Sequence, residues 1–128
     1  MNGPTDPLAW TTRAEEDYAL ARSALRRKKP LTYGAAFHAQ QCAEKYLKAP
    51  LVARGQVFPK THDLAALSDL CTQNSVLIPV DQDALQRLTA YAVQVRYPGE
   101  APSADEARLS LKTAQAVRRF ARKLLEVA

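Results

Sequence analysis

The sequence predicts an all-α protein, a single up-and-down bundle of four to five helices. Apolar residues recur at helical spacing along five stretches, and none shows the alternation or β-branched clustering of a strand. The chain has 128 residues, 47% hydrophobic and 24% charged, which suits one globular domain with its own core. We expect residues 1–7 to form a flexible N-terminal arm and residues 8–128 to form the bundle domain.

The first two expected helices are long and occupy most of the first half of the chain. The first spans residues 8–28 and ends before Pro30, which cannot continue it. The second spans residues 33–53, with Gly55 as its stop and Pro50 bending its last turn or two. The apolar side of the first helix is Ala14, Tyr18, Ala21 and Leu25.

Two shorter helices are expected next. After an extended connector at 57–60, Thr61 caps a helix over residues 63–73. A loop that contains Pro79 then leads to a helix over residues 81–95. The residues expected to face inward are Leu64, Leu67 and Leu70 on the first of these and Leu85, Leu88, Ala92 and Val95 on the second.

The last expected helix spans residues 104–127. The segment 96–102 breaks the preceding helix because it holds two prolines and a glycine. Ser103 and Glu106 then have the spacing of a capping box, which marks a helix start. Its expected inward residues are Leu109, Thr113, Ala116, Val117, Phe120 and Leu124.

Residues 36–49 carry the most information about function. At about 100° per residue, they separate into an apolar side and a polar stripe roughly 80° wide. The apolar side is Ala36, Ala39, Cys42, Ala43, Tyr46 and Leu47, and the stripe is His38, Gln41, Lys45 and Lys48. Such a stripe suits an anionic ligand, a phosphate above all. It is equally the composition of an ordinary solvent-facing helix side, on which Glu44 and Lys48 form an i,i+4 pair.

Two further groups of polar residues stand at helix ends. His62, at the expected start of the third helix, suits contact with a phosphate oxygen, although His62 and Asp63 also suit simple capping of that helix. Arg96 and Tyr97 precede the proline-fixed turn at Pro98. The arginine suits bidentate phosphate binding, or equally the stabilisation of the last helical carbonyls.

Composition excludes several classes of protein and site. Cys42 and Cys71 are expected to be buried free thiols, and no spacing suits a disulfide framework or a metal site. No apolar run approaches the roughly 18 residues of a membrane span, and residues 1–7 lack a signal-peptide pattern. We therefore expect a cytoplasmic protein without a cofactor. The net charge of +5 gathers at residues 26–29 and in the last helix, where it would attract nucleic acid or an acidic partner.

Four segments, in order, resemble the HEPN domain family (higher eukaryotes and prokaryotes nucleotide-binding). They are residues 36–49, residues 59–64, residues 96–99 and the alanine-rich last helix. The resemblance implies a homodimeric helical bundle that binds a nucleotide or RNA. It also implies a separately encoded minimal nucleotidyltransferase as partner, in a pair of the toxin–antitoxin type. The ligand-binding residues that we assign are His38, Gln41, Lys45, Lys48, His62, Arg96 and Tyr97.

Catalytic members of the family are metal-independent ribonucleases in which four to six residues separate an arginine from a following histidine. Here Arg96 has no histidine in that range, and neither His38 nor His62 has an arginine at that distance. We therefore expect a binding protein rather than an enzyme. The alternatives are a divergent endoribonuclease that uses His62 and Arg96, and a helical module that only contacts other proteins.

Overall fold

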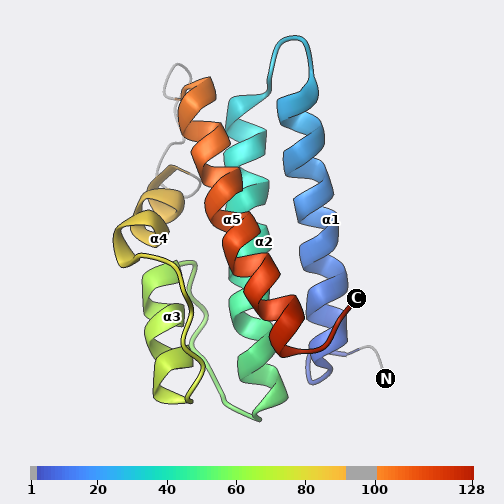
Figure 1. The fold of residues 1–128 in the computed structure, drawn as a ribbon, viewed down its shortest axis with the longest axis vertical. Coiled ribbons are helices and arrows are strands. Elements are labelled where there is room, and N and C mark those ends of the chain that lie inside the picture. Colours follow the sequence, from blue (N-terminus) through green and yellow to red (C-terminus); the bar gives the residue numbers. More distant parts are fainter. Residues whose placement is uncertain (1–2, 92–100) are drawn as a thin grey trace.

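The computed structural model describes residues 3–91 and 101–128, and within them the chain forms five helices and no strand. This confirms the all-α prediction. The helices are α1 (Pro7–Arg26), α2 (Thr32–Ala53), α3 (Leu64–Gln73), α4 (Gln82–Thr89) and α5 (Ala104–Leu124). The long helices α1 and α2 form an antiparallel hairpin, with α5 packed against both (Figure 1). The short helices α3 and α4 return the chain, so that α5 runs in the direction of α2.

Side-chain caps determine where most of the helices begin. Asp6 accepts a hydrogen bond from the backbone N–H of Leu8, and Pro7 occupies the first turn, where its missing N–H costs nothing. Ser103 and Glu106 form the predicted capping box of α5. The predicted cap of α3 was wrong, because Asp63, not Thr61, accepts from the N–H of Ala66.

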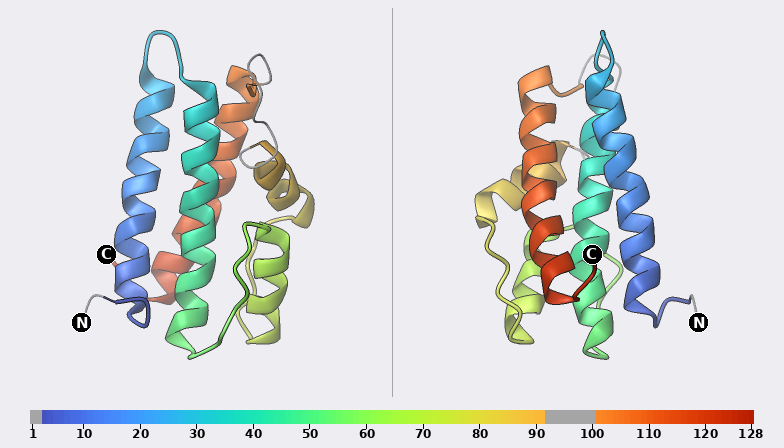
Figure 2. Two further views of the ribbon diagram at one scale, coloured as in Figure 1. Left: turned by 180° about the vertical axis from the view of Figure 1, so that it is seen from behind. Right: turned by 45° about the vertical axis from the view of Figure 1, so that its right-hand side comes forward.

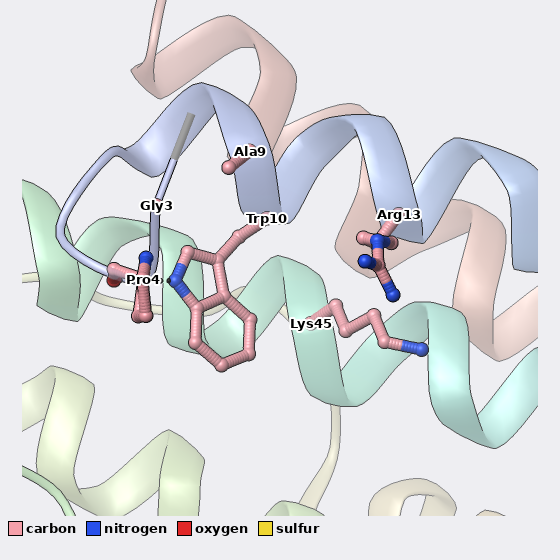
Figure 3. A pocket seen from close by; sticks show the side chains of 6 residues that line it. All are labelled: Gly3, Pro4, Ala9, Trp10, Arg13 and Lys45. Atoms are coloured by element: carbon pink, nitrogen blue, oxygen red, sulfur yellow. Dashed lines mark hydrogen bonds between the residues drawn. The ribbon is translucent and has the colours of Figure 1, made fainter. Parts of the chain in front are cut away.

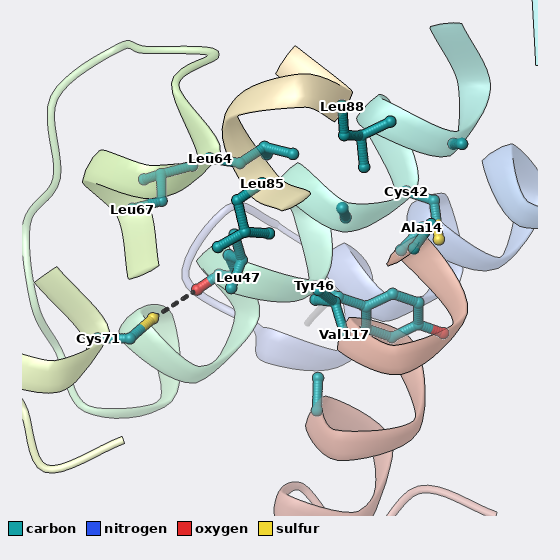
Figure 4. Packing of buried hydrophobic residues seen from close by; sticks show 14 of the residues in the cluster. Ala14, Cys42, Tyr46, Leu47, Leu64, Leu67, Cys71, Leu85, Leu88 and Val117 are labelled. Carbon is teal, nitrogen blue, oxygen red and sulfur yellow. Dashed lines mark hydrogen bonds between the residues drawn. The ribbon is translucent and has the colours of Figure 1, made fainter. Parts of the chain in front are cut away.

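The core is centred on α2. All six residues of its predicted apolar side are fully buried, which confirms that side. Figure 4 shows leucines from α3 and α4 packed against one part of α2, while α1 and α5 pack against the part around Tyr46. The large buried side chains are Tyr46, Leu47, Leu51, Leu64, Leu67, Leu85, Leu88 and Val117.

Small residues, rather than leucines, form the buried stripe of α5. Leu109 and Leu124 were predicted to face inward but are 44% and 41% exposed. The buried residues are Ala107, Ser110, Thr113, Ala114, Val117 and Ala121. Because α5 crosses close to α2, side chains at the contact must be short, and the leucines fall to either side of it.

Helix α2 ends at the predicted residue, and the end of the predicted fourth helix lies outside the described residues. Pro50 lies inside α2, and the helix continues to Ala53 before Gly55 adopts a left-handed φ of 67°, so the predicted stop is confirmed. The α-helical part of α4 ends at Thr89. Ala92 and Val95, predicted to face inward there, lie outside the described residues.

Candidate functional site

Two residues of the polar stripe on α2, His38 and Lys45, are turned toward a carboxylate of α1. Asp17, which is 8% exposed, accepts a hydrogen bond from Nδ1 of His38 at 2.9 Å through one oxygen. Nζ of Lys45 donates to its other oxygen. His38 and Lys45 lie two turns apart on α2, so one carboxylate joins both of them to α1.

The lower part of the stripe is turned toward Glu44, which is 5% exposed. This carboxylate accepts from Nζ of Lys48 at 2.9 Å, Nδ1 of His62 at 2.7 Å and Nε2 of Gln40 at 3.2 Å. Burial pushes the pKa of Glu44 upward, but the hydrogen bonds from His62 and Lys48 outweigh it, so that its pKa lies below the ordinary value. Glu44 is therefore an ionised, almost fully buried anchor for two cationic or titratable groups.

Gln40 and Gln41 connect Glu44 to Lys45, and Lys45 in turn contacts Asp17. Nε2 of Gln41 donates to Oε1 of Gln40 at 2.9 Å, and Gln40 donates in turn to the carbonyl of His62 at 2.9 Å. The structure thus brings together five of the seven predicted ligand-binding residues: His38, Gln41, Lys45, Lys48 and His62. The other two, Arg96 and Tyr97, lie outside the described residues.

Lys48 does not occupy the solvent-facing position that the alternative interpretation of the stripe requires. It is 8% exposed. Its ammonium group lies 5.8 Å from the ring centre of Trp10 and 5.4 Å from that of Phe58, and it pairs with Glu44. The predicted pair between Glu44 and Lys48 exists, but as a buried pair rather than a surface one.

Sequence reasoning missed the carboxylates that organise this network. Asp17 lies three residues after Ala14 and four before Ala21, inside the buried stripe of α1. That spacing was a usable signal, since a charged residue within an apolar stripe requires a buried partner. Glu44 gave a weaker signal, because its spacing to Lys48 is also that of a surface pair.

A second polar cluster joins α1, α2 and α5. Arg118 donates to both oxygens of Glu15, at 2.7 and 2.8 Å. The hydroxyl of Tyr46 donates to Glu15 and accepts from Arg122 at 3.1 Å. The hydrogen bonds from Arg118 hold the pKa of Glu15 below its ordinary value. Because its hydrogen bonds tie α5 to both α1 and α2, we call this cluster the structural clamp.

The hairpin of α1 and α2 carries two open pockets. The larger one, of about 340 Å³, is lined by Gly3, Pro4, Ala9, Trp10, Arg13 and Lys45. Figure 3 shows the indole ring and the two cationic side chains along it, and the indole N–H is held by the carbonyl of Pro4 at 2.8 Å. The smaller one, of about 230 Å³, lies nearer the hairpin turn and is lined by Leu20, Ser23, Ala24, Arg27, Leu31, Gly34 and His38.

The two cysteines are buried, and the described residues contain neither a cluster of metal-binding side chains nor a membrane-spanning helix. Cys42 and Cys71 are fully buried free thiols, as predicted, and burial raises the pKa of Cys42 and brings that of Cys71 to about 11. No three His, Cys, Asp or Glu side chains among residues 3–91 and 101–128 are grouped to hold a metal ion. None of the helices described has the length and hydropathy of a bilayer span.

Comparison with known proteins places the chain in a family. A model of the HEPN domain matches residues 8–124, nearly the whole sequence. The chain belongs to the HEPN domain family. Membership indicates a function related to nucleotides or RNA. Neither the curated proteins nor the solved structures contain a match.

Proposed function

We propose that this HEPN protein binds the phosphate groups of a nucleotide or RNA and acts beside a separately encoded minimal nucleotidyltransferase. The pair would be of the toxin–antitoxin type, and the HEPN chain a cytoplasmic homodimer. The ligand class follows from membership of the family. The partner and the type of pair follow from the resemblance of residues 36–49, 59–64 and 96–99 to members encoded beside such enzymes.

The observation that carries the ligand proposal is the position of Lys45. Its side chain lines the larger pocket with Trp10 and Arg13, and its ammonium group, directed away from the indole, lies near Arg13 and also contacts Asp17. Two cations beside an indole suit a nucleotide, whose phosphate pairs with the cations while its base stacks on the ring. Lys48 is not included, because only 8% of it is exposed and it lines neither pocket.

Calorimetric titration with nucleoside triphosphates and with short RNA tests this proposal. We expect measurable heat for the wild type and a loss of affinity for Lys45→Gln, which removes the charge and keeps a donor toward Asp17. Lys112→Ala is the matched control, since Lys112 is exposed on the opposite helix, α5. Negligible heat for the wild type with every ligand would refute the ligand proposal and leave a protein-interaction module.

The proposed partner is tested separately. Coexpression with the neighbouring reading frame, followed by size-exclusion chromatography with light scattering, would detect both a stable complex and a homodimer. A neighbour that is not a nucleotidyltransferase, or one that never co-elutes, would contradict the partnership.

One observation favours the alternative of a divergent ribonuclease. Nδ1 of His62 is fixed on the buried carboxylate of Glu44, while 61% of the imidazole side chain is exposed. In this arrangement, Nε2 is directed away from the carboxylate and is available for acid–base chemistry. Cleavage of labelled RNA in the presence of EDTA, abolished by His62→Gln, would support it. Equal cleavage by wild type and variant, or none by either, would exclude this role for His62.

A further inference from the structure

The two pockets lie along the same α1–α2 hairpin, and we call the surface that runs from one to the other the α1–α2 groove. On α1, the lining residues 13, 20, 24 and 27 lie on one helical side, and residue 17 stands on that side between the two pockets, at a spacing of three or four. On α2, the corresponding side is residues 34, 38, 41 and 45. Between the pockets, Asp17 contacts both Lys45, which lines the larger pocket, and His38, which lines the smaller one.

The rest of the bundle leaves this groove uncovered. The left view of Figure 2 shows α1 and α2 side by side in front, with α5 behind them. The clamp of Glu15 and Arg118 lies on the α5 side of α1. From position 13 to position 27 on α1, the groove extends about 21 Å at 1.5 Å per residue.

Cations border this groove along its length, with aromatic rings near both ends. Arg13 and Lys45 line the pocket of Trp10 at one end, and Arg27 is the cation that lines the other pocket, beside the imidazole of His38. Beside His38, the ring of Phe37 lies 5.3 Å away and stacks on Tyr33 at 6.4 Å. Phe37 and Tyr33 are 36% and 44% exposed, although aromatic side chains usually bury most of their surface.

The charges near the groove are predominantly positive. Exposed Arg26, Lys28 and Lys29 flank Arg27 at the hairpin turn. Asp17 is already neutralised by Lys45. The exposed acidic residue on this side of α1 is Glu16, between Arg13 and Leu20. A second copy of the chain would have to bring two such basic turns or grooves together, which disfavours self-association here.

We propose that the α1–α2 groove binds a single-stranded RNA several nucleotides long, with phosphates on Arg13, Lys45 and Arg27 and bases on the aromatic rings at either end. Exposed rings combined with a cationic groove are the general means of binding unpaired nucleic acid. This inference rests on the proposed nucleotide or RNA function and extends it from one pocket to an oligonucleotide surface.

Fluorescence provides two independent readouts of this binding. Trp10 is the single tryptophan of the chain, so stacking of a base on the indole should quench the intrinsic emission. The anisotropy of a labelled 12-nucleotide oligouridine reports binding along the whole groove. We expect the 12-mer to bind far more tightly than uridine monophosphate, because it reaches both pockets.

Variants at each end identify the surface. Arg13→Ala and Arg27→Ala should each weaken binding of the 12-mer about three- to tenfold, and Glu16→Gln should tighten it. Lys112→Ala on α5 should leave it unchanged. A melting curve for each variant establishes that it is folded.

The outcomes separate this inference from the proposed function. If nucleotides bind in a Lys45-dependent manner, but the 12-mer is no tighter and Arg27→Ala has no effect, the groove is refuted and the nucleotide site stands. The groove is also refuted if Lys112→Ala weakens binding as much as Arg13→Ala. It is refuted as well if light scattering shows a dimer that Arg13→Glu disrupts, because the groove would then be the dimer interface. Absence of binding by any nucleotide or RNA would refute both.

Discussion

At the scale of single residues, Asp17 and Glu44 determine what the cations of α2 can do. Each carboxylate is nearly buried, and each neutralises one lysine and orients one histidine. Lys48 is therefore held in the interior, whereas part of the Lys45 side chain lines the larger pocket. A stripe that looks uniform in the sequence is thus divided by its buried counter-charges.

Asp17→Asn should destabilise the fold by about 1–3 kcal/mol, because two donors lose a charged acceptor in a partly buried site. Urea unfolding followed by circular dichroism measures this difference. The adjacent substitution Glu16→Gln is the matched control, since Glu16 is exposed and should change stability by less than about 0.5 kcal/mol. Equal effects of the two substitutions would show that Asp17 does not anchor the hairpin.

Acidification should weaken the fold through Glu44 and Glu15, whose pKa values are both lowered in the folded protein. Their contribution to the free energy of unfolding is fully present above the ordinary carboxyl pKa of 4.5 and is lost as the pH falls through the folded values. Urea unfolding between pH 7 and pH 3 should therefore show stability declining below about pH 4.5.

Glu44→Gln isolates the contribution of one carboxylate. The difference in stability between wild type and Glu44→Gln should be largest near pH 7 and should shrink toward pH 3, since the protonated carboxyl resembles an amide. A difference independent of pH would mean that ionisation of Glu44 is unimportant to the fold.

At the scale of elements, helix existence was more predictable than helix orientation. Proline, glycine and capping residues indicated where the helices begin and end. The buried side of α2 followed directly from the spacing of its apolar residues. On α5, two competing stripes were present, and close packing selected the alanine-rich one over Leu109 and Leu124. The distance between two helices decides which of two stripes is buried, and periodicity in the sequence gives no information on that distance.

Ser103→Ala should destabilise the protein by about 1 kcal/mol, because the hydroxyl accepts from the N–H of Glu106 at 3.1 Å at the start of α5. Thermal unfolding provides the measurement. Ser23→Ala is a useful control, since Ser23 is an exposed interior position of α1 where alanine, the better helix former, should be neutral or stabilising. A loss of stability at Ser23 equal to that at Ser103 would contradict a specific capping role.

At the scale of the whole molecule, the candidate site arises from residues that are distant in the chain. The α2 stripe and His62 were identifiable from the sequence, but their carboxylate partners and the contributions of Trp10 and Arg13 depend on how α1 lies against α2. That arrangement is a tertiary property, built from the small residues Ala14, Ala21 and Ala39 in the hairpin interface. The sequence pattern therefore indicated the ligand class, whereas the residues that form the binding surface could be identified only from the tertiary structure.

The salt dependence of RNA binding depends on the number of phosphates that the whole groove neutralises. Three contacts, at Arg13, Lys45 and Arg27, predict a slope of about −2 for log K against log salt concentration with single-stranded RNA. Arg27→Ala should reduce its magnitude by about 0.7, whereas Lys112→Ala should not change it. Anisotropy titrations between 50 and 300 mM KCl, roughly the range over which screening changes most, provide the slopes. A slope near zero for the wild type would mean that RNA, if bound, is not held by phosphate contacts in this groove.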